Sequence, residues 1–149
     1  MSEKLYIKNI EQLRIFAAEF ASTLKVSTAV FLIGQMGAGK TTFTAHLARA
    51  LGVKERVVSP TFVIGHEYTS GRLPLLHIDA YKIVTASTST ERVLDELEAL
   101  DIETVLKRGV VVFEWCEQVA DSLACERVEV RIEVDKISGA RIIEVEYCA

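Results

Sequence analysis

The residue pattern with the clearest chemical meaning runs from Gly34 to Thr41 and reads Gly-Gln-Met-Gly-Ala-Gly-Lys-Thr. It matches G-x-x-x-x-G-K-[ST], a loop whose successive backbone N–H groups hold phosphate. Glycines permit the backbone angles and the close approach that this requires. The pattern predicts that Lys40 reaches the β- and γ-phosphates of a nucleotide and that the Thr41 hydroxyl binds Mg²⁺. The predicted cradle residues are Gly34, Gly37, Ala38, Gly39, Lys40, Thr41 and Thr42.

A magnesium ion at such a loop needs a further acidic ligand, and two residues qualify. Glu114 ends the apolar run Val110 to Phe113, and Asp79 ends the run Leu75 to Ile78. An acid that ends a buried strand in a chain with this loop is the expected metal or water-positioning group. An acid at a strand end can also be merely solvated, so position alone does not assign the two roles. His77 alternates with Asp79 and is expected on the same face of its strand.

The elements that must position these residues can be predicted from hydrophobic periodicity. Helices are expected over Asn9–Leu24, Thr41–Leu51 and Glu91–Lys107, the last with a break near Asp101; strands are expected over 29–33, 62–68, 73–78, 110–113, 126–134 and 141–147. Mixed helices and strands predict an α/β fold, a three-layer P-loop NTPase-like domain with a mostly parallel central sheet. The last two strands should form an antiparallel C-terminal hairpin at an edge or end of the sheet, and residues 1–149 should form one domain.

Composition indicates which kinds of partner the chain can bind and in which compartment it is expected. The 149 residues carry a net charge of -4, which disfavours independent binding of nucleic acid, so any RNA should be held by a partner. The three cysteines are odd in number and lack metal-ligand spacing, as expected for reduced thiols. The first residues lack the apolar core of a signal peptide, and no apolar run approaches the roughly 20 residues of a membrane span. These features predict a cytoplasmic protein.

Four segments in order give the chain a resemblance to a known family. They are the cradle Gly34–Thr42, Ser59-Pro60-Thr61-Phe62, His77-Ile78-Asp79-Ala80-Tyr81 and Glu114-Trp115. Together they resemble the TsaE (YjeE) family, small bacterial P-loop ATPases required for the threonylcarbamoyl modification of adenosine in tRNA. The cradle alone is shared by many families, whereas its combination with the other three is far more specific.

The resemblance implies a role for each matching residue. Thr41 and Glu114 are implied to ligate Mg²⁺, and Asp79 to position the attacking water or the metal's shell. Thr61 is implied to approach the γ-phosphate. Trp115 is implied to lie beside the nucleotide and to contact a partner. The implied partners are TsaB and TsaD, whose complex is reset by ATP hydrolysis, and tRNA is reached only through that complex.

The chain departs from the family pattern at three places. Lys82 stands where the family usually has arginine, Asp101 where a glycine is expected, and Ala124-Cys125 where Leu-Pro is usual. None of these lies in the cradle, so they affect only details of the regions around them.

Two other functions are compatible with the cradle. A small-molecule kinase would need a lid arginine, and Arg72 is the loop arginine that resembles one. A nucleotide-dependent scaffold would bind ATP and hydrolyse little. No arginine lies in a recognisable motif near the cradle, near Asp79 or near Glu114, and fast P-loop enzymes use an arginine to stabilise the transition state. The sequence therefore predicts slow hydrolysis by the isolated chain and acceleration by a partner complex.

Overall fold

The computed structural model describes residues 2–59, 64–81, 90–116 and 126–148. In chain order its elements are β1 (Ser2–Ile7), α1 (Ile10–Thr23), β2 (Thr28–Ile33), α2 (Lys40–Ala50), β3 (Gly65–Tyr68), β4 (Leu75–Asp79), α4 (Thr90–Glu98), α5 (Ile102–Leu106), β5 (Val110–Glu114), β6 (Glu126–Val134) and β7 (Arg141–Cys148). Within these ranges, none of the helices combines the length and the apolar character needed to cross a bilayer.

The strands form one seven-stranded mixed sheet in the order β1-β7-β6-β2-β5-β4-β3. The four central strands are parallel, since β2 pairs with both β5 and β6, and β5 also pairs with β4. The remaining pairs, β1 with β7, β6 with β7 and β3 with β4, are antiparallel. The α/β class, the parallel centre and the antiparallel C-terminal strands are confirmed.

The C-terminal hairpin does not form the edge of the sheet, contrary to the expectation from sequence. β6 lies against β2 in the parallel centre, and β1 covers the outer side of β7. The sequence pattern missed β1, because its first half is polar and only Leu5 and Ile7 alternate as a buried face would. All six residues of β1 pair with residues 141–146 of β7. This pairing holds the segment in the sheet although its intrinsic strand propensity is low.

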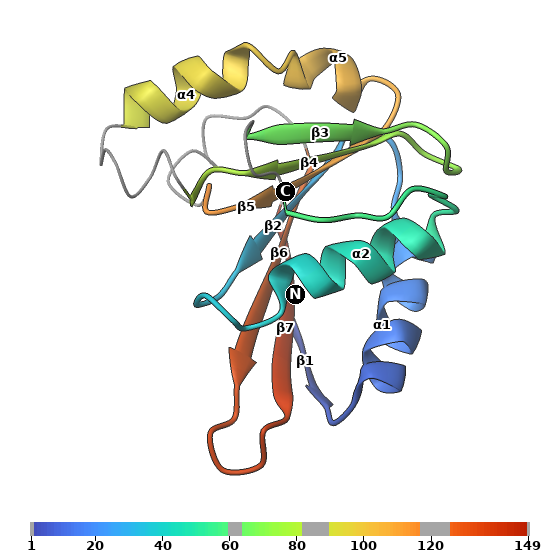
Figure 1. Ribbon diagram of the computed structural model, residues 1–149, viewed down its shortest axis with the longest axis vertical. Coiled ribbons are helices and arrows are strands. Elements are labelled where there is room, and N and C mark those ends of the chain that lie inside the picture. Colours follow the sequence, from blue (N-terminus) through green and yellow to red (C-terminus); the bar gives the residue numbers. More distant parts are fainter. Residues whose placement is uncertain (1, 60–63, 82–89, 117–125, 149) are drawn as a thin grey trace.

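Helices cover both faces of the sheet, which gives the expected three layers (Figure 1). β2 shows why, because Val30 and Leu32 belong to the core under α1 and α2, whereas Ala29 and Phe31 belong to the core under α4 and α5. All four side chains are at most 1% exposed. A strand buried on both faces reads as a continuous apolar run, as the sequence of β2 does.

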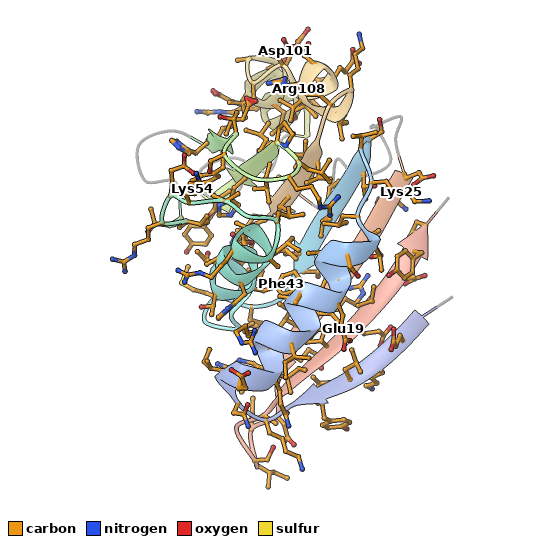
Figure 2. The ribbon with its side chains drawn as sticks, turned by 90° about the vertical axis from the view of Figure 1, so that its right-hand side faces the viewer. Glu19, Lys25, Phe43, Lys54, Asp101 and Arg108 are labelled. Carbon is orange, nitrogen blue, oxygen red and sulfur yellow. The ribbon has the colours of Figure 1, made fainter. Side chains whose placement is uncertain are left out.

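Helix α1 fixes the position of α2, the helix that follows the cradle. Asn9 caps α1 by accepting a hydrogen bond from the Gln12 N–H at 2.9 Å. Phe43 of α2 packs on two rings of α1, with centroid distances of 5.7 Å to Phe16 and 5.8 Å to Phe20. Phe43 lies where the two helices meet (Figure 2). This aromatic contact holds the first turn of α2 against α1.

The expected break near Asp101 is confirmed, since α4 ends at Glu98 and α5 begins at Ile102. Asp101 has φ 52° and ψ 50°, the left-handed conformation in which a Cβ is unfavourable. The resemblance led us to expect glycine here, and glycine adopts this conformation without strain. Aspartate is among the few other residues that tolerate it.

Candidate functional site

The cradle begins where β2 ends and finishes at the first turn of α2. At Gly34 a side chain would collide with the backbone of β6, because a Cβ there would lie 2.5 Å from the Ile132 carbonyl oxygen. Gly39 has φ 108° and immediately precedes α2. Both positions need glycine for these separate reasons. The first N–H groups of α2 have no partner within the helix, so its N-terminus is suited to bind an anion.

Lys40 is held at the mouth of the cradle. Its side chain is 6% exposed, and its ammonium group donates a hydrogen bond to the Gly34 carbonyl oxygen at 2.5 Å. The same Nζ atom lies 3.8 Å from the centroid of the Trp115 ring, a cation–π contact. Trp115 has φ 65°, which is rare for a bulky residue and typical of functional sites. Lys40 Nζ is therefore held between the Gly34 carbonyl oxygen and the Trp115 ring.

The cradle residue Thr41 meets a side chain that lies 73 residues away in sequence. The Thr41 hydroxyl donates to the Glu114 carboxylate, at 3.3 Å from Oε1 and 3.2 Å from Oε2. Glu114 is only 2% exposed, and its Oε2 lies 2.5 Å from the ring Nε2 of His77. A buried carboxylate needs such partners because burial removes its water. Oxygen atoms from a threonine and a carboxylate are ligands that Mg²⁺ prefers.

Asp79 lies next to Glu114, since the two residues are partners in the β4–β5 register. Each of its carboxylate oxygens accepts one hydrogen bond, from the Ser59 hydroxyl at 2.7 Å and from the Tyr81 N–H at 3.0 Å. Asp79 therefore anchors the start of the Ser59–Phe62 segment. Thr61 itself lies outside the described residues, so its predicted approach to the γ-phosphate stays a prediction.

A cavity of about 420 Å³ joins these groups at the carboxyl ends of β2, β4 and β5. Lys40, Thr41, Asp79, Glu114 and Trp115 all line it. Among the described residues, no three His, Cys, Asp or Glu side chains are clustered to hold a metal.

A residue that the sequence analysis did not place at the cradle also lines the cavity. Arg141 is the first residue of β7, and its Nε donates to the Ala38 carbonyl oxygen at 2.8 Å while Nη1 donates to the Gly139 oxygen at 3.0 Å. The turn before it is fixed by Asp135, which accepts hydrogen bonds from the Ile137 N–H and the Ser138 hydroxyl. These bonds lower the pKa of Asp135 below its ordinary value.

No motif in the sequence placed Arg141 at the cradle, although the fold brings it there. Ala38 and Arg141 are 103 residues apart, and only the pairing of β6 with β2 and β7 brings them together.

Known proteins share the sequence and the fold of this chain. Residues 7–143 match the family described as "Threonylcarbamoyl adenosine biosynthesis protein TsaE". The chain belongs to the TsaE family. Its relatives include TsaE of Streptomyces coelicolor, 38% identical over 137 residues, which are 91% of this chain and 86% of that protein. TsaE of Bacillus subtilis is 36% identical over 126 residues, which are 84% of this chain and 73% of the relative. The crystal structure of B. subtilis YdiB matches with a TM-score of 0.78 at 30% identity, covering 100% of this chain and 87% of that one.

The structure of this TsaE family member brings together the predicted Lys40, Thr41, Asp79, Glu114 and Trp115. His77 also belongs to this group, because its ring Nε2 contacts the Glu114 carboxylate. Nδ1 of His77 is buried and has no hydrogen-bond partner within the described ranges. Arg72, the residue that resembled a kinase lid, instead donates from Nη2 to the Ala21 carbonyl oxygen of α1 at 2.9 Å. Lys82 and Ala124-Cys125 lie outside the described residues.

Proposed function

We propose that the chain binds ATP with Mg²⁺ in the cavity between the cradle and the ends of β4 and β5, and that it hydrolyses ATP slowly. The meeting of Thr41 and Glu114 beside Lys40 supports this proposal best, because it joins a metal-binding oxygen pair to a phosphate-binding loop. Residues 1–149 would then form one ATPase domain.

Each residue has a distinct task in this proposal. The cradle N–H groups and Lys40 bind and orient the phosphates, and Thr41 and Glu114 hold Mg²⁺. Bound Mg²⁺ supplies charge stabilisation at the phosphate oxygens. Asp79, with its oxygens held by Ser59 and Tyr81, positions the attacking water. Trp115 and Tyr81, whose ring centroids are 5.0 Å apart, form a wall beside Lys40.

Arg141 does not supply the catalytic arginine of a fast P-loop enzyme in this arrangement. Its guanidinium donates hydrogen bonds to the Ala38 and Gly139 carbonyl oxygens. Among the described residues, no arginine other than Arg141 lines the cavity. We therefore propose that turnover is slow until a partner completes the site, a contribution worth roughly a thousandfold or more in related enzymes.

Membership of the TsaE family supports a proposal about the partner. We propose that the chain acts with a TsaB–TsaD-type complex in the threonylcarbamoyladenosine modification of tRNA, and that ATP hydrolysis resets this complex between cycles. The net charge of -4 agrees with contact to tRNA only through the complex.

The test is steady-state ATP hydrolysis by the purified chain, alone and with a reconstituted TsaB–TsaD pair. Slow turnover alone and marked acceleration by the pair would support the proposal. Fast turnover that the pair does not change would refute it. A control with Asp79→Asn separates a scaffold from an ATPase, because a scaffold would still support repeated rounds of tRNA modification after hydrolysis is lost.

A further inference from the structure

A fully buried histidine lies behind Glu114, the acid proposed above to hold Mg²⁺. His77 is the middle residue of β4, and its ring Nε2 lies 2.5 Å from Glu114 Oε2. β4 pairs with β3 on one side and with β5 on the other, so both neighbours fix the backbone of His77. A side chain on such a strand has little freedom to move and can hold a neighbouring group in one position.

The contact also assigns the tautomer of His77. A carboxylate oxygen accepts hydrogen bonds, so Nε2 is the ring nitrogen that carries the proton and donates it. Nδ1 then has a lone pair and no partner among the described residues. The neighbours of His77 along β4, Leu76 and Ile78, are apolar and at most 4% exposed. Burying an imidazole in this strand costs more free energy than burying an apolar side chain, and the contact with Glu114 is what the imidazole adds.

This contact gives the two carboxylate oxygens of Glu114 different surroundings. Oε2 faces both His77 and the Thr41 hydroxyl, whereas Oε1 has only the Thr41 hydroxyl, at 3.3 Å, within the described part of the chain. Glu114 and Thr41 line the cavity of about 420 Å³, and His77 does not. His77 therefore holds Oε2 from behind, and Oε1 is the oxygen left available to a cation in the cavity.

We propose that His77 is a positioning residue that orients Glu114 toward Mg²⁺, an inference that rests on the binding of ATP and Mg²⁺ proposed above. His77 touches neither the nucleotide nor the cation in this arrangement and acts only through the carboxylate. Groups that hydrogen-bond to a metal ligand fix its orientation, and their removal lowers metal affinity by about 10- to 100-fold. Without the Nε2 donor, the carboxylate can rotate away from the cation.

A purely structural histidine is the alternative, and two variants separate the two roles. Glutamine at position 77 can place its amide nitrogen near the position of Nε2 and still donate to Glu114. Asparagine is one methylene shorter, places its amide nitrogen near the position of Nδ1 and does not reach the carboxylate. Both amides are polar and uncharged, so the difference between His77→Gln and His77→Asn reports on the hydrogen bond rather than on burial.

The test measures ATP affinity by calorimetry at saturating Mg²⁺ and in EDTA, because the ratio of the two affinities reports the coupling between Mg²⁺ and ATP. His77→Asn should lower this ratio about tenfold, and His77→Gln should change it less than about threefold. In EDTA both variants should bind ATP within about twofold of the parent, since the cradle is untouched. Ile78→Val, a buried change on the other face of β4, is the control for lost packing and should keep the parental ratio.

A double-mutant cycle tests whether His77 acts through Glu114. When Glu114 is already glutamine, His77→Asn should lower the ratio by less than about threefold, because the carboxylate that His77 orients is gone. A full tenfold fall in both backgrounds would overturn the inference. So would an unchanged ratio in His77→Asn alone, which would leave the proposed function standing. A parent protein that binds ATP equally well with Mg²⁺ and in EDTA would overturn the proposed metal site and this inference together.

Nitrogen NMR of the protein without metal gives a readout that needs no change at position 77. The chain has three histidines, so the imidazole signals that remain after His46→Gln and His66→Gln belong to His77. A proton on Nε2 supports the inference. A proton on Nδ1 alone would overturn it, because a bare Nε2 cannot donate to Glu114.

Discussion

Replacing Glu114 by glutamine separates the metal-binding role of this residue from its role in the fold. The carboxylate is buried, accepts a hydrogen bond from Thr41 and touches His77 Nε2. Glutamine has the same shape, and its amide can bond to both neighbours. Only the negative charge is removed, so the change in Mg²⁺ dependence reports on that charge.

The expected size can be worked out from simple electrostatics. We count Mg²⁺ as one net unit charge, because the phosphate oxygens bound to it offset the other. A unit charge and a carboxylate about 4 Å apart interact by about 4 kcal/mol at an effective dielectric constant near 20. Because the amide oxygen still offers a lone pair to the cation, we take half of this value. A loss of about 2 kcal/mol raises the Mg²⁺ concentration needed for half-maximal effect by roughly 30-fold. With EDTA present, ATP should bind Glu114→Gln as well as or better than the parent, because a negative charge near the phosphates is gone.

The free protein should tolerate the change. Each of two charge-assisted hydrogen bonds becomes a neutral one, a loss of about 1 kcal/mol per bond. The variant no longer buries a carboxylate, whose desolvation costs several kcal/mol. We therefore expect the free energy of unfolding in urea to fall by no more than about 1 kcal/mol, or to rise.

The assay is a Mg²⁺ titration of ATP binding by calorimetry, with Glu98→Gln as the control. Glu98 lies exposed on α4 and undergoes the same chemical change away from the cavity. An unchanged Mg²⁺ dependence in Glu114→Gln would show that Glu114 is not a metal ligand. A loss of ATP binding in EDTA would show that it acts on the fold instead.

Four other outcomes are expected. Lys40→Ala should weaken ATP binding at least about tenfold and abolish hydrolysis, because its ammonium group meets the phosphates; unchanged calorimetry and turnover would contradict the cradle assignment. Asp79→Asn should bind ATP normally and hydrolyse it at least about tenfold more slowly, whereas parental turnover would remove its assigned role. Saturating ATP should change the emission of Trp115, the one tryptophan in the chain, because Lys40 lies over its ring; constant emission would count against that arrangement. Asp101→Gly should stabilise the fold to urea by up to about 1 kcal/mol and Asp101→Val should destabilise it, since φ is 52°; equal losses would contradict the strain.

Sequence alone was sufficient for the features that depend on local spacing. The spacing of the cradle residues is complete within Gly34–Thr41, and the apolar runs of β2 and β5 already show that both faces are buried. The acids Asp79 and Glu114 could be placed at one edge of the sheet because parallel strands end together. The break at Asp101 was visible because a helical pattern was interrupted where the resemblance called for glycine.

Tertiary structure alone decided which distant groups meet. Strand order and register bring Thr41 to Glu114, Glu114 to His77, and Arg141 to Ala38. No short stretch of sequence specifies the order or the register of the strands. The polar N-terminus becomes β1 only because β7 offers it an edge, and the hairpin enters the sheet only because β6 pairs with β2. Such long-range strand pairing is stabilised by the packed core and by the backbone hydrogen bonds of the whole sheet rather than by local propensity. The sequence of one segment therefore does not reveal which strand it will pair with.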